Sequence, residues 1–238
     1  DIVFKREPYL DRNRYDRKPT NIDKLRPTML ACPSLANSKK AAKLRPQPVL
    51  SNIRHGKTTI EKIYDVSFCG AATSKLRIQL CSDLKKMVKA SFLGLYSGSN
   101  IVLDQAIPEA IKVERLPHRM FNQLIDSSKI NLALDGLGQL TFRHLEIWAR
   151  GSFMMAAPSL TEIEFPVVQP VVGQHYETFH SLNELIEKIG YYSDHQKELE
   201  EIADSGNKFL NFMYNFKRHG DEIKSAITDS SNKNNRGN

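Results

Sequence analysis

Residues 130–156 read INLALDGLGQLTFRHLEIWARGSFMMA, and this stretch decides the fold. An apolar run is followed by a loop with two glycines, a helix-forming segment from Phe142 and a second apolar run. Strand, loop, helix and strand in this order form a βαβ unit, whose loop lies at the carboxyl edge of a parallel sheet. Because open α/β sheets bind their ligands at that edge, we expect a binding site in this loop.

The same alternation extends to both sides of this unit. The pattern predicts strands over 63–69 and 91–96, a weak strand over 111–113, and helices over 73–89 and 117–128. A short extended piece is expected over 176–179, and Ser181 and Glu184 form a capping box that opens a further helix. A final helix carries an apolar stripe from Leu199 to Met213.

The chain divides into three expected parts. Residues 1–62 hold six of the 11 prolines, which predicts a linker with short extended pieces such as 28–32. Strands alternate with helices over 63–215, which predicts an α/β domain with a Rossmann-like parallel sheet flanked by helices. Residues 216–238 are expected to be the end of a helix and then, from Thr228, a disordered tail.

The net charge of +7 is concentrated near the N-terminus. Residues 1–62 hold 15 Lys and Arg against 6 Asp and Glu, a net charge of +9, whereas the rest of the chain carries −2. A basic segment can bind nucleic acid or an anionic membrane surface, or it can be a solvated connector. The connector is favoured, because basic residues occur at most in adjacent pairs and no aromatic ladder is interleaved with them.

The composition indicates a globular protein with no segment for the membrane. No apolar run approaches the roughly 20 residues that span a bilayer, and the first residues lack the apolar core of a signal peptide. The absence of an initiator Met indicates a fragment or a processed product. Cys32, Cys69 and Cys81 fit no zinc or CxxC spacing, so we expect a reducing, cytoplasmic location.

The turn after the first strand is a candidate phosphate site. Gly70 permits a tight exit from the strand, and Thr73 or Ser74 can cap the helix that follows. The free N–H groups at a helix start attract phosphate, and Lys75 and Arg77 add positive charge beside them. The alternative is that these two basic residues belong to a solvated face.

The helix from Phe142 supplies the second candidate site. Arg143, Glu146 and Arg150 lie on the side opposite the apolar positions. An arginine near a helix start can grip a phosphate, and a glutamate one turn later can accept hydrogen bonds from a vicinal diol. On spacing alone, a Glu146–Arg150 surface ion pair is the favoured alternative. The loop that enters this helix completes the predicted site with Asp135, Gly138 and Thr141.

Other classes of site are not supported. Residues 56–58 resemble part of a P-loop, but that motif requires glycine where Ser51 stands. Ser97 lacks the spacing of a GxSxG elbow, so a serine hydrolase is not indicated. No Asp-x-Asp or HExxH pattern occurs, so neither a metal clamp for a sugar nucleotide nor a zinc site is expected.

Four segments together carry a resemblance to a known family. They are 64–70 with Arg77 behind it, 127–134, 142–151, and 173–179 running into 182–206. In order and spacing they resemble the C-terminal half of GT-B fold glycosyltransferases of the CgeB-like, family-one type. They also show some likeness to the capsule-associated protein O-glucosyltransferases. The opening residues 1–6 resemble the end of such an enzyme's N-terminal domain, so the resemblance implies that 1–62 is the remnant of that domain plus a basic linker.

The resemblance implies a glycosyltransferase whose donor is a nucleoside-diphosphate sugar, with no metal and no cofactor. It implies that Glu146 holds the ribose and that Lys75 or Arg77 neutralises the diphosphate. It also implies that Arg143 neutralises the diphosphate and is the catalytic residue. Many relatives have a second glutamate where this chain has Gly138. The acceptor, whether glycan, protein or small molecule, stays open, and a further N-terminal domain is expected in the same polypeptide. The alternative is a non-catalytic binding module that docks nucleic acid through 1–62.

The functional expectation depends on one spatial proposition. The turns that leave the sheet beside Gly70 and Thr141 should converge on a shared pocket for a diphosphate nucleotide.

Overall fold

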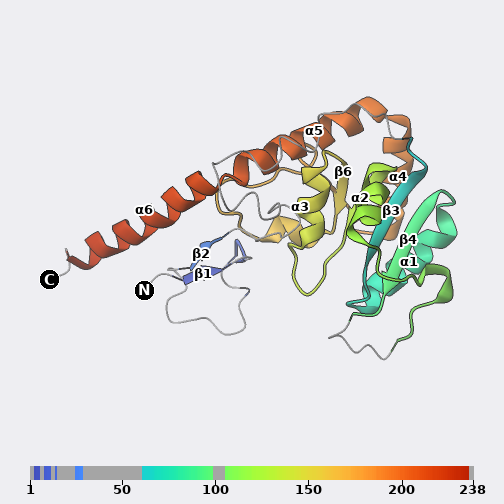
Figure 1. The fold of residues 1–238 in the computed structure, drawn as a ribbon, viewed down its shortest axis with the longest axis horizontal. Coiled ribbons are helices and arrows are strands. Elements are labelled where there is room, and N and C mark those ends of the chain that lie inside the picture. The colour runs from blue at the N-terminus through green and yellow to red at the C-terminus, as the bar shows by residue number, and fades with distance from the viewer. Residues whose placement is uncertain are drawn as a thin grey trace.

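The computed structural model describes residues 3–5, 8–11, 14, 25–28, 61–98 and 105–235. Within these residues a five-stranded sheet forms the centre of the protein (Figure 1). Its strands are β3 (Tyr64–Ala71), β4 (Ser91–Tyr96), β5 (Ser128–Ala133), β6 (Phe153–Ala156) and β7 (Glu177–Thr178). They lie in the order β4-β3-β5-β6-β7, and every neighbouring pair is parallel. The predicted Rossmann-like α/β sheet is confirmed.

Helices cover both faces of this sheet. Helices α1 (Lys75–Met87) and α4 (Leu182–Asp194) pack against one face, and α2 (His118–Asp126) and α3 (Phe142–Ala149) pack against the other. Helix α5 (Gln196–Met213) contributes side chains to the hydrophobic clusters on both faces. The result is a doubly wound sheet, in which ligands bind at the carboxyl edge.

The continuous apolar character of the strands follows from this double coverage. In β6, Phe153 and Met155 belong to one hydrophobic cluster, whereas Met154 and Ala156 belong to the other. Successive side chains of a strand point to opposite faces, and here both faces are buried. The sequence therefore shows an unbroken apolar run rather than an alternation of apolar and polar residues.

The N-terminal residues form a second, separate sheet. Its strands, β1 (Val3–Lys5) and β2 (Leu25–Pro27), pair in parallel. After β1 the backbone contacts the segment that follows β6, because the Leu10 N–H donates to the carbonyl of Glu162 at 2.9 Å and the Glu164 N–H donates to that of Pro8 at 2.7 Å. Residues 29–60 of the segment expected to be a linker lie outside the described residues, and so does the extended piece at 28–32 apart from Thr28.

The weak strand predicted over 111–113 is wrong. The chain forms a short 3-10 helix, η3 (Glu109–Ile111), followed by a single parallel bridge between Lys112 and Leu95 of β4. Because the 3-10 helix occupies Ile111, only the residues after it pair with β4, where the Val113 N–H donates to the carbonyl of Leu95 at 2.9 Å.

The disordered tail expected from Thr228 is also wrong as far as Asn235. Helix α6 (Phe216–Asn235) continues away from the sheet beyond α5 (Figure 1). Residues 221–235 contain neither Gly nor Pro, so no residue there interrupts a helix. Although α6 is 20 residues long, it is polar, and no helix of the described ranges has the length and apolar character needed to cross a bilayer.

Trp148 of α3 is fully buried and is among the largest side chains of the core. Its ring makes edge-to-face contacts with Phe165, Tyr176 and Phe209. Its indole N–H donates to the carbonyl of His175 at 2.7 Å. Gly206 in α5 packs against this group, since a Cβ there would lie 2.5 Å from the His175 carbonyl oxygen and 2.6 Å from Trp148 Cδ1. Helix α5 can approach α3 only because position 206 has no side chain.

Gly206→Ala should therefore lower the free energy of unfolding by about 1–3 kcal/mol, even though alanine favours a helix over glycine. The matched control is Gly190→Ala in α4, where a Cβ would meet no atom within 4 Å. We expect this control to stabilise the fold by about 0.5–1 kcal/mol. Urea denaturation of both variants measures the difference. Equal changes in the two would contradict the close approach at Gly206.

Candidate functional site

A cavity of about 570 Å³ lies at the carboxyl edge of the sheet. This volume is within the usual range for small-molecule sites. The end of β3 and Arg77 of α1 line it, together with the connections from β4 to α2 and from β5 to α3 and the first residues of α2 and α3. Its lining residues are Phe68, Cys69, Gly70, Ala71, Arg77, Tyr96, Arg115, Leu116, Pro117, His118, Phe121, Leu134, Gly136, Thr141, Phe142, Arg143 and Glu146.

The two predicted turns meet in this cavity. Of the predicted site residues, the structure places five on its lining: Gly70, Arg77, Thr141, Arg143 and Glu146. These residues come from segments separated by more than 60 positions, and they meet because β3 and β5 are neighbours in the sheet. The spatial convergence expected from the sequence is therefore present in the fold.

Three other predicted residues do not line the cavity. Lys75, the first residue of α1, is exposed. Asp135 is also exposed, and its carboxylate accepts a hydrogen bond from the Ser159 hydroxyl. Gly138 shapes the loop itself, since its carbonyl accepts a hydrogen bond from the Gly136 N–H at 3.0 Å. A role for these three residues toward a ligand stays a prediction.

The helix that follows β3, α1, begins with a side-chain cap. The Ser74 hydroxyl accepts a hydrogen bond from the Arg77 N–H at 3.2 Å, so Ser74 rather than Thr73 caps α1. Gly70 makes a close approach, because a Cβ there would lie 2.9 Å from Cζ of Phe68. The absence of a side chain at position 70 thus lets the Phe68 ring lie beneath the turn and form part of the cavity lining.

Arg77 lies under the two turns with little exposure to solvent. Its exposed fraction is 7%, and burial lowers the pKa of its guanidinium. Its Nη1 donates to the carbonyl of Ala71 at 2.7 Å. Its Nη2 donates to the carbonyls of Leu134, at 2.8 Å, and of Asp135. These bonds direct three of its donors into the main chain of the protein.

Arg143 stands at the start of α3 and faces the cavity. Its Nη2 donates to the carbonyl of Cys69, and its guanidinium lies 3.7 Å from the centre of the Phe121 ring. Burial lowers the pKa of Arg143 to about 10, and the nearby carboxylate of Glu146 opposes that shift. The group is therefore a cation at neutral pH, held against an aromatic face that stabilises its charge.

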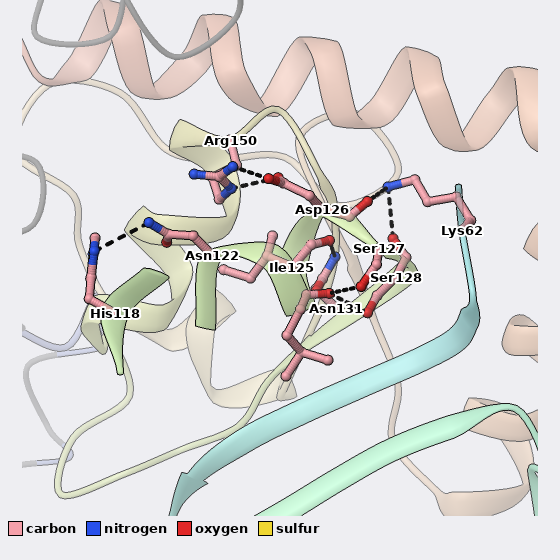
Figure 2. A network of polar contacts seen from close by, with 10 residues as sticks. Lys62, His118, Asn122, Ile125, Asp126, Ser127, Ser128, Asn131 and Arg150 are labelled. Carbon is pink, nitrogen blue, oxygen red and sulfur yellow. Dashed lines mark hydrogen bonds and ion pairs between the residues drawn. The ribbon is translucent and has the colours of Figure 1, made fainter. Parts of the chain in front are cut away.

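Glu146 lies one turn after Arg143 on the cavity wall. The sequence offered an ion pair between Glu146 and Arg150 as the alternative to a binding role. In the structure, Arg150 pairs with Asp126 instead. The Arg150 guanidinium binds the carboxylate of Asp126 through both Nε, at 2.6 Å, and Nη2. This pair faces the amino edge of the sheet, away from the cavity, where Lys62 also donates to the Asp126 carbonyl at 2.7 Å (Figure 2). The ion pair of Arg150 therefore lies away from the cavity wall to which Glu146 belongs.

Thr141 caps α3 with the help of a residue that the sequence analysis did not single out. The Thr141 N–H donates to Nδ1 of His144 at 3.1 Å, and His144 is fully buried. Burial lowers the pKa of His144 to about 3, so the ring is neutral at pH 7. Because Nδ1 accepts this bond, the ring proton is on Nε2. His144 therefore fixes the start of α3, beside Arg143, without adding charge.

The connection from β4 to α2 supplies residues that sequence reasoning missed. Arg115 and His118 are both exposed and both line the cavity, together with Tyr96 at the end of β4. The position of this segment could have identified these residues, because a segment that follows a parallel strand leaves the sheet at its carboxyl edge. Residues 111–113 were instead assigned to a strand, so the connection was not considered as part of the site.

The cavity carries an excess of positive charge. Its lining includes the guanidinium groups of Arg77, Arg115 and Arg143, against the single carboxylate of Glu146. Within the described ranges, no group of three or more His, Cys, Asp or Glu side chains is placed to hold a metal ion. The arrangement favours an anionic ligand that also offers hydroxyl groups to one carboxylate.

Comparisons with known proteins place the chain in a family. A family model described as glycosyl transferase-like matches residues 80–223, which is more than half of the chain. Among solved structures, sucrose-phosphate synthase from Thermosynechococcus elongatus is similar, at 7% sequence identity and a TM-score of 0.45. That similarity covers 71% of this chain and 46% of the synthase, so the chain spans less than half of the length of that enzyme. No curated protein matches.

Proposed function

This chain belongs to the glycosyl transferase-like family, and we propose that it binds a nucleoside-diphosphate sugar at the carboxyl edge of its sheet and transfers the sugar to an acceptor. The observation that carries the proposal is the convergence of two turns on one cavity. There, Arg143 and Glu146 lie one helical turn apart, and the lining has a cationic excess. The cations can bind a diphosphate, and the carboxylate can accept hydrogen bonds from the hydroxyl groups of a ribose.

The diphosphate is proposed to lie between the end of β3 and the start of α3. The start of α3 offers backbone N–H groups and the positive end of a helix dipole. Arg143 adds a cation that is partly withdrawn from water. As the bond between sugar and diphosphate breaks, negative charge grows on the leaving diphosphate, and preorganised donors stabilise it without moving. The proposal requires no metal ion for this step.

Glu146 is proposed to hold the ribose of the donor. A carboxylate has two oxygens, so it can accept one hydrogen bond from each hydroxyl of a vicinal diol. The position of Glu146, one turn into α3 from Arg143, separates the ribose site from the diphosphate site along the cavity wall. The two residues therefore have different predicted effects: Arg143 on the rate of transfer and Glu146 on nucleotide affinity.

The finer features implied by the resemblance are also part of the proposal. We assign the domain to the donor-binding half of a GT-B enzyme of the CgeB-like type, with its acceptor site supplied by an N-terminal domain of the same polypeptide. The sugar, the nucleotide base and the acceptor stay open, as does a cytoplasmic location.

Isothermal titration calorimetry with UDP, GDP, ADP, CDP and dTDP tests the proposal. We expect at least one of them to bind, and Glu146→Ala to weaken that binding by about 10- to 100-fold. The control is Arg119→Ala, an exposed arginine of α2 outside the cavity, which should bind like the parent. If none of the five nucleotides binds, and a polynucleotide binds with an affinity that falls as salt rises, the proposal is overturned in favour of a non-catalytic module.

A further inference from the structure

Arg77 occupies the point where the sheet opens. Strand β3 pairs with β4 along its length as far as Ala71, opposite Tyr96. Its register with β5, on the other side, ends at Ser67 and Asn131. The strand order reverses between these two neighbours, and at such a switch point the carboxyl ends separate and leave a crevice. The cavity lies at this crevice.

The guanidinium of Arg77 spans the crevice. On the β3 side it donates from Nη1 to the carbonyl of Ala71 at 2.7 Å. On the β5 side it donates from Nη2 to the carbonyls of Leu134, at 2.8 Å, and Asp135. The side chain thus connects two strand ends where the backbone ladder between them has stopped. A planar guanidinium with several fixed donors suits this task.

Both turns pack against the same group. A Cβ at Gly70 would lie 3.6 Å from Nη1 of Arg77, and a Cβ at Gly136 would lie 3.7 Å from Nη2. The Phe68 ring lies 5.1 Å from the guanidinium carbon. The remaining Nε is buried and has no hydrogen-bond partner within the described residues. The side chain is therefore enclosed by the two turns and one ring.

We propose that Arg77 is a positioning residue that holds the two turns of the cavity at a fixed separation, and that it does not itself grip the diphosphate. This assignment replaces the role that the resemblance implied for Arg77. The charge of Arg77 still contributes to the potential of the cavity, but its donors are directed to the carbonyls of the two strand ends. The inference rests on the proposed function only where nucleotide binding is the readout.

The variants Arg77→Lys and Arg77→Ala show whether nucleotide binding depends on the hydrogen bonds that position the two turns or only on the positive charge at position 77. Lysine keeps the charge, but its compact ammonium cannot donate across the crevice to carbonyls of both strands. Turns that are no longer held at their separation lose hydrogen bonds to a charged ligand, so we expect both variants to weaken nucleotide binding by about 10- to 100-fold. Arg119→Ala should bind like the parent. Parent-like affinity in Arg77→Lys would overturn the inference.

Rescue by free guanidinium ion distinguishes positioning from a loss of general stability. At equal ionic strength, millimolar guanidinium chloride should restore most of the affinity of Arg77→Ala, and sodium chloride should not. Guanidinium weakens the fold in general, so a rescue cannot arise from general stabilisation. Absence of rescue in a folded Arg77→Ala protein would overturn the inference.

A readout without nucleotide makes the test independent of the proposed function. Cys69 lies at the end of β3 with an exposed fraction of 2%. Alkylation of its thiol, followed by peptide mass spectrometry, should be at least about ten-fold faster in Arg77→Ala than in the parent, and guanidinium should slow it again. Unchanged protection of Cys69 would overturn the inference. If no nucleotide binds to the parent, the proposed function fails, and the alkylation rate still decides the role of Arg77.

Discussion

Arg143→Ala should lower the rate of sugar transfer by about 100- to 1,000-fold, which corresponds to about 3–4 kcal/mol of transition-state stabilisation. The expectation follows from a guanidinium held against the Phe121 ring and facing the cavity at the start of α3. Its pKa of about 10 keeps it charged at neutral pH. Hydrolysis of the nucleotide sugar by water measures the effect without knowledge of the acceptor.

Two further variants show whether charge or packing is responsible. Arg143→Met preserves an unbranched side chain that can pack on Phe121 but removes the cation, so it should be nearly as slow as Arg143→Ala. Arg119→Ala removes an exposed arginine outside the cavity and should have the parent rate. If Arg143→Met hydrolyses the donor at the parent rate, the charge at position 143 has no part in the reaction.

Glu146→Ala should weaken nucleotide binding by about 10- to 100-fold, because hydrogen bonds to a charged group contribute about 1.5–3 kcal/mol. The proposed partners are the two ribose hydroxyls, and this can be tested directly. The parent should bind a 2′-deoxynucleoside diphosphate more weakly than the ribonucleotide. In Glu146→Ala the two ligands should bind equally, because the carboxylate that distinguishes them has been removed.

Glu146→Gln provides the matched control for shape. The amide retains an acceptor oxygen, so this variant should lie between the parent and Glu146→Ala in affinity for the ribonucleotide. A 2′-deoxy penalty of the same size in the parent and in Glu146→Ala would show that the hydroxyl contacts some other group. The ribose would then have to be placed elsewhere in the cavity.

The fold could be predicted from the sequence wherever a segment is buried on both sides or begins with a capping residue. Residues 128–156 contain the strands β5 and β6 and the helix α3 in the expected order, with boundaries that shift by only one or two residues from the prediction. Ser181 caps α4 as predicted, since its hydroxyl accepts a hydrogen bond from the Glu184 N–H at 3.1 Å. These signals are local, so the sequence alone contains them.

The parts that failed depend on contacts between distant segments or on weak local signals. The segment at 111–113 has strand-like residues, but its place at the edge allows only one bridge. After residue 216 only the end of a helix was expected, because the segment from Thr228 lacks large apolar residues, yet nothing in 221–235 interrupts a helix and α6 continues to Asn235. Arg150 had a suitable partner four residues away in Glu146, yet the structure pairs it with Asp126, 24 residues earlier in the chain.

The candidate site shows the same division between local and distant contacts. The sequence placed Gly70, Thr141, Arg143 and Glu146 at one edge of the sheet, because every segment that follows a parallel strand leaves at that edge. It could not show that the donors of Arg77 are directed to carbonyls, one of which lies 57 residues away. That arrangement depends on the separation of β3 from β5, which no spacing in the sequence encodes.

The most direct test of the account is a crystal structure of the protein with a nucleoside diphosphate that it binds. We expect the diphosphate between the turn after Gly70 and the start of α3, within hydrogen-bond distance of Arg143. The ribose hydroxyls should contact the carboxylate of Glu146, and Arg77 should still donate to the carbonyls of Ala71 and Leu134. A nucleotide bound at the amino edge of the sheet, or one that leaves Arg143 and Glu146 without contact, would contradict the account.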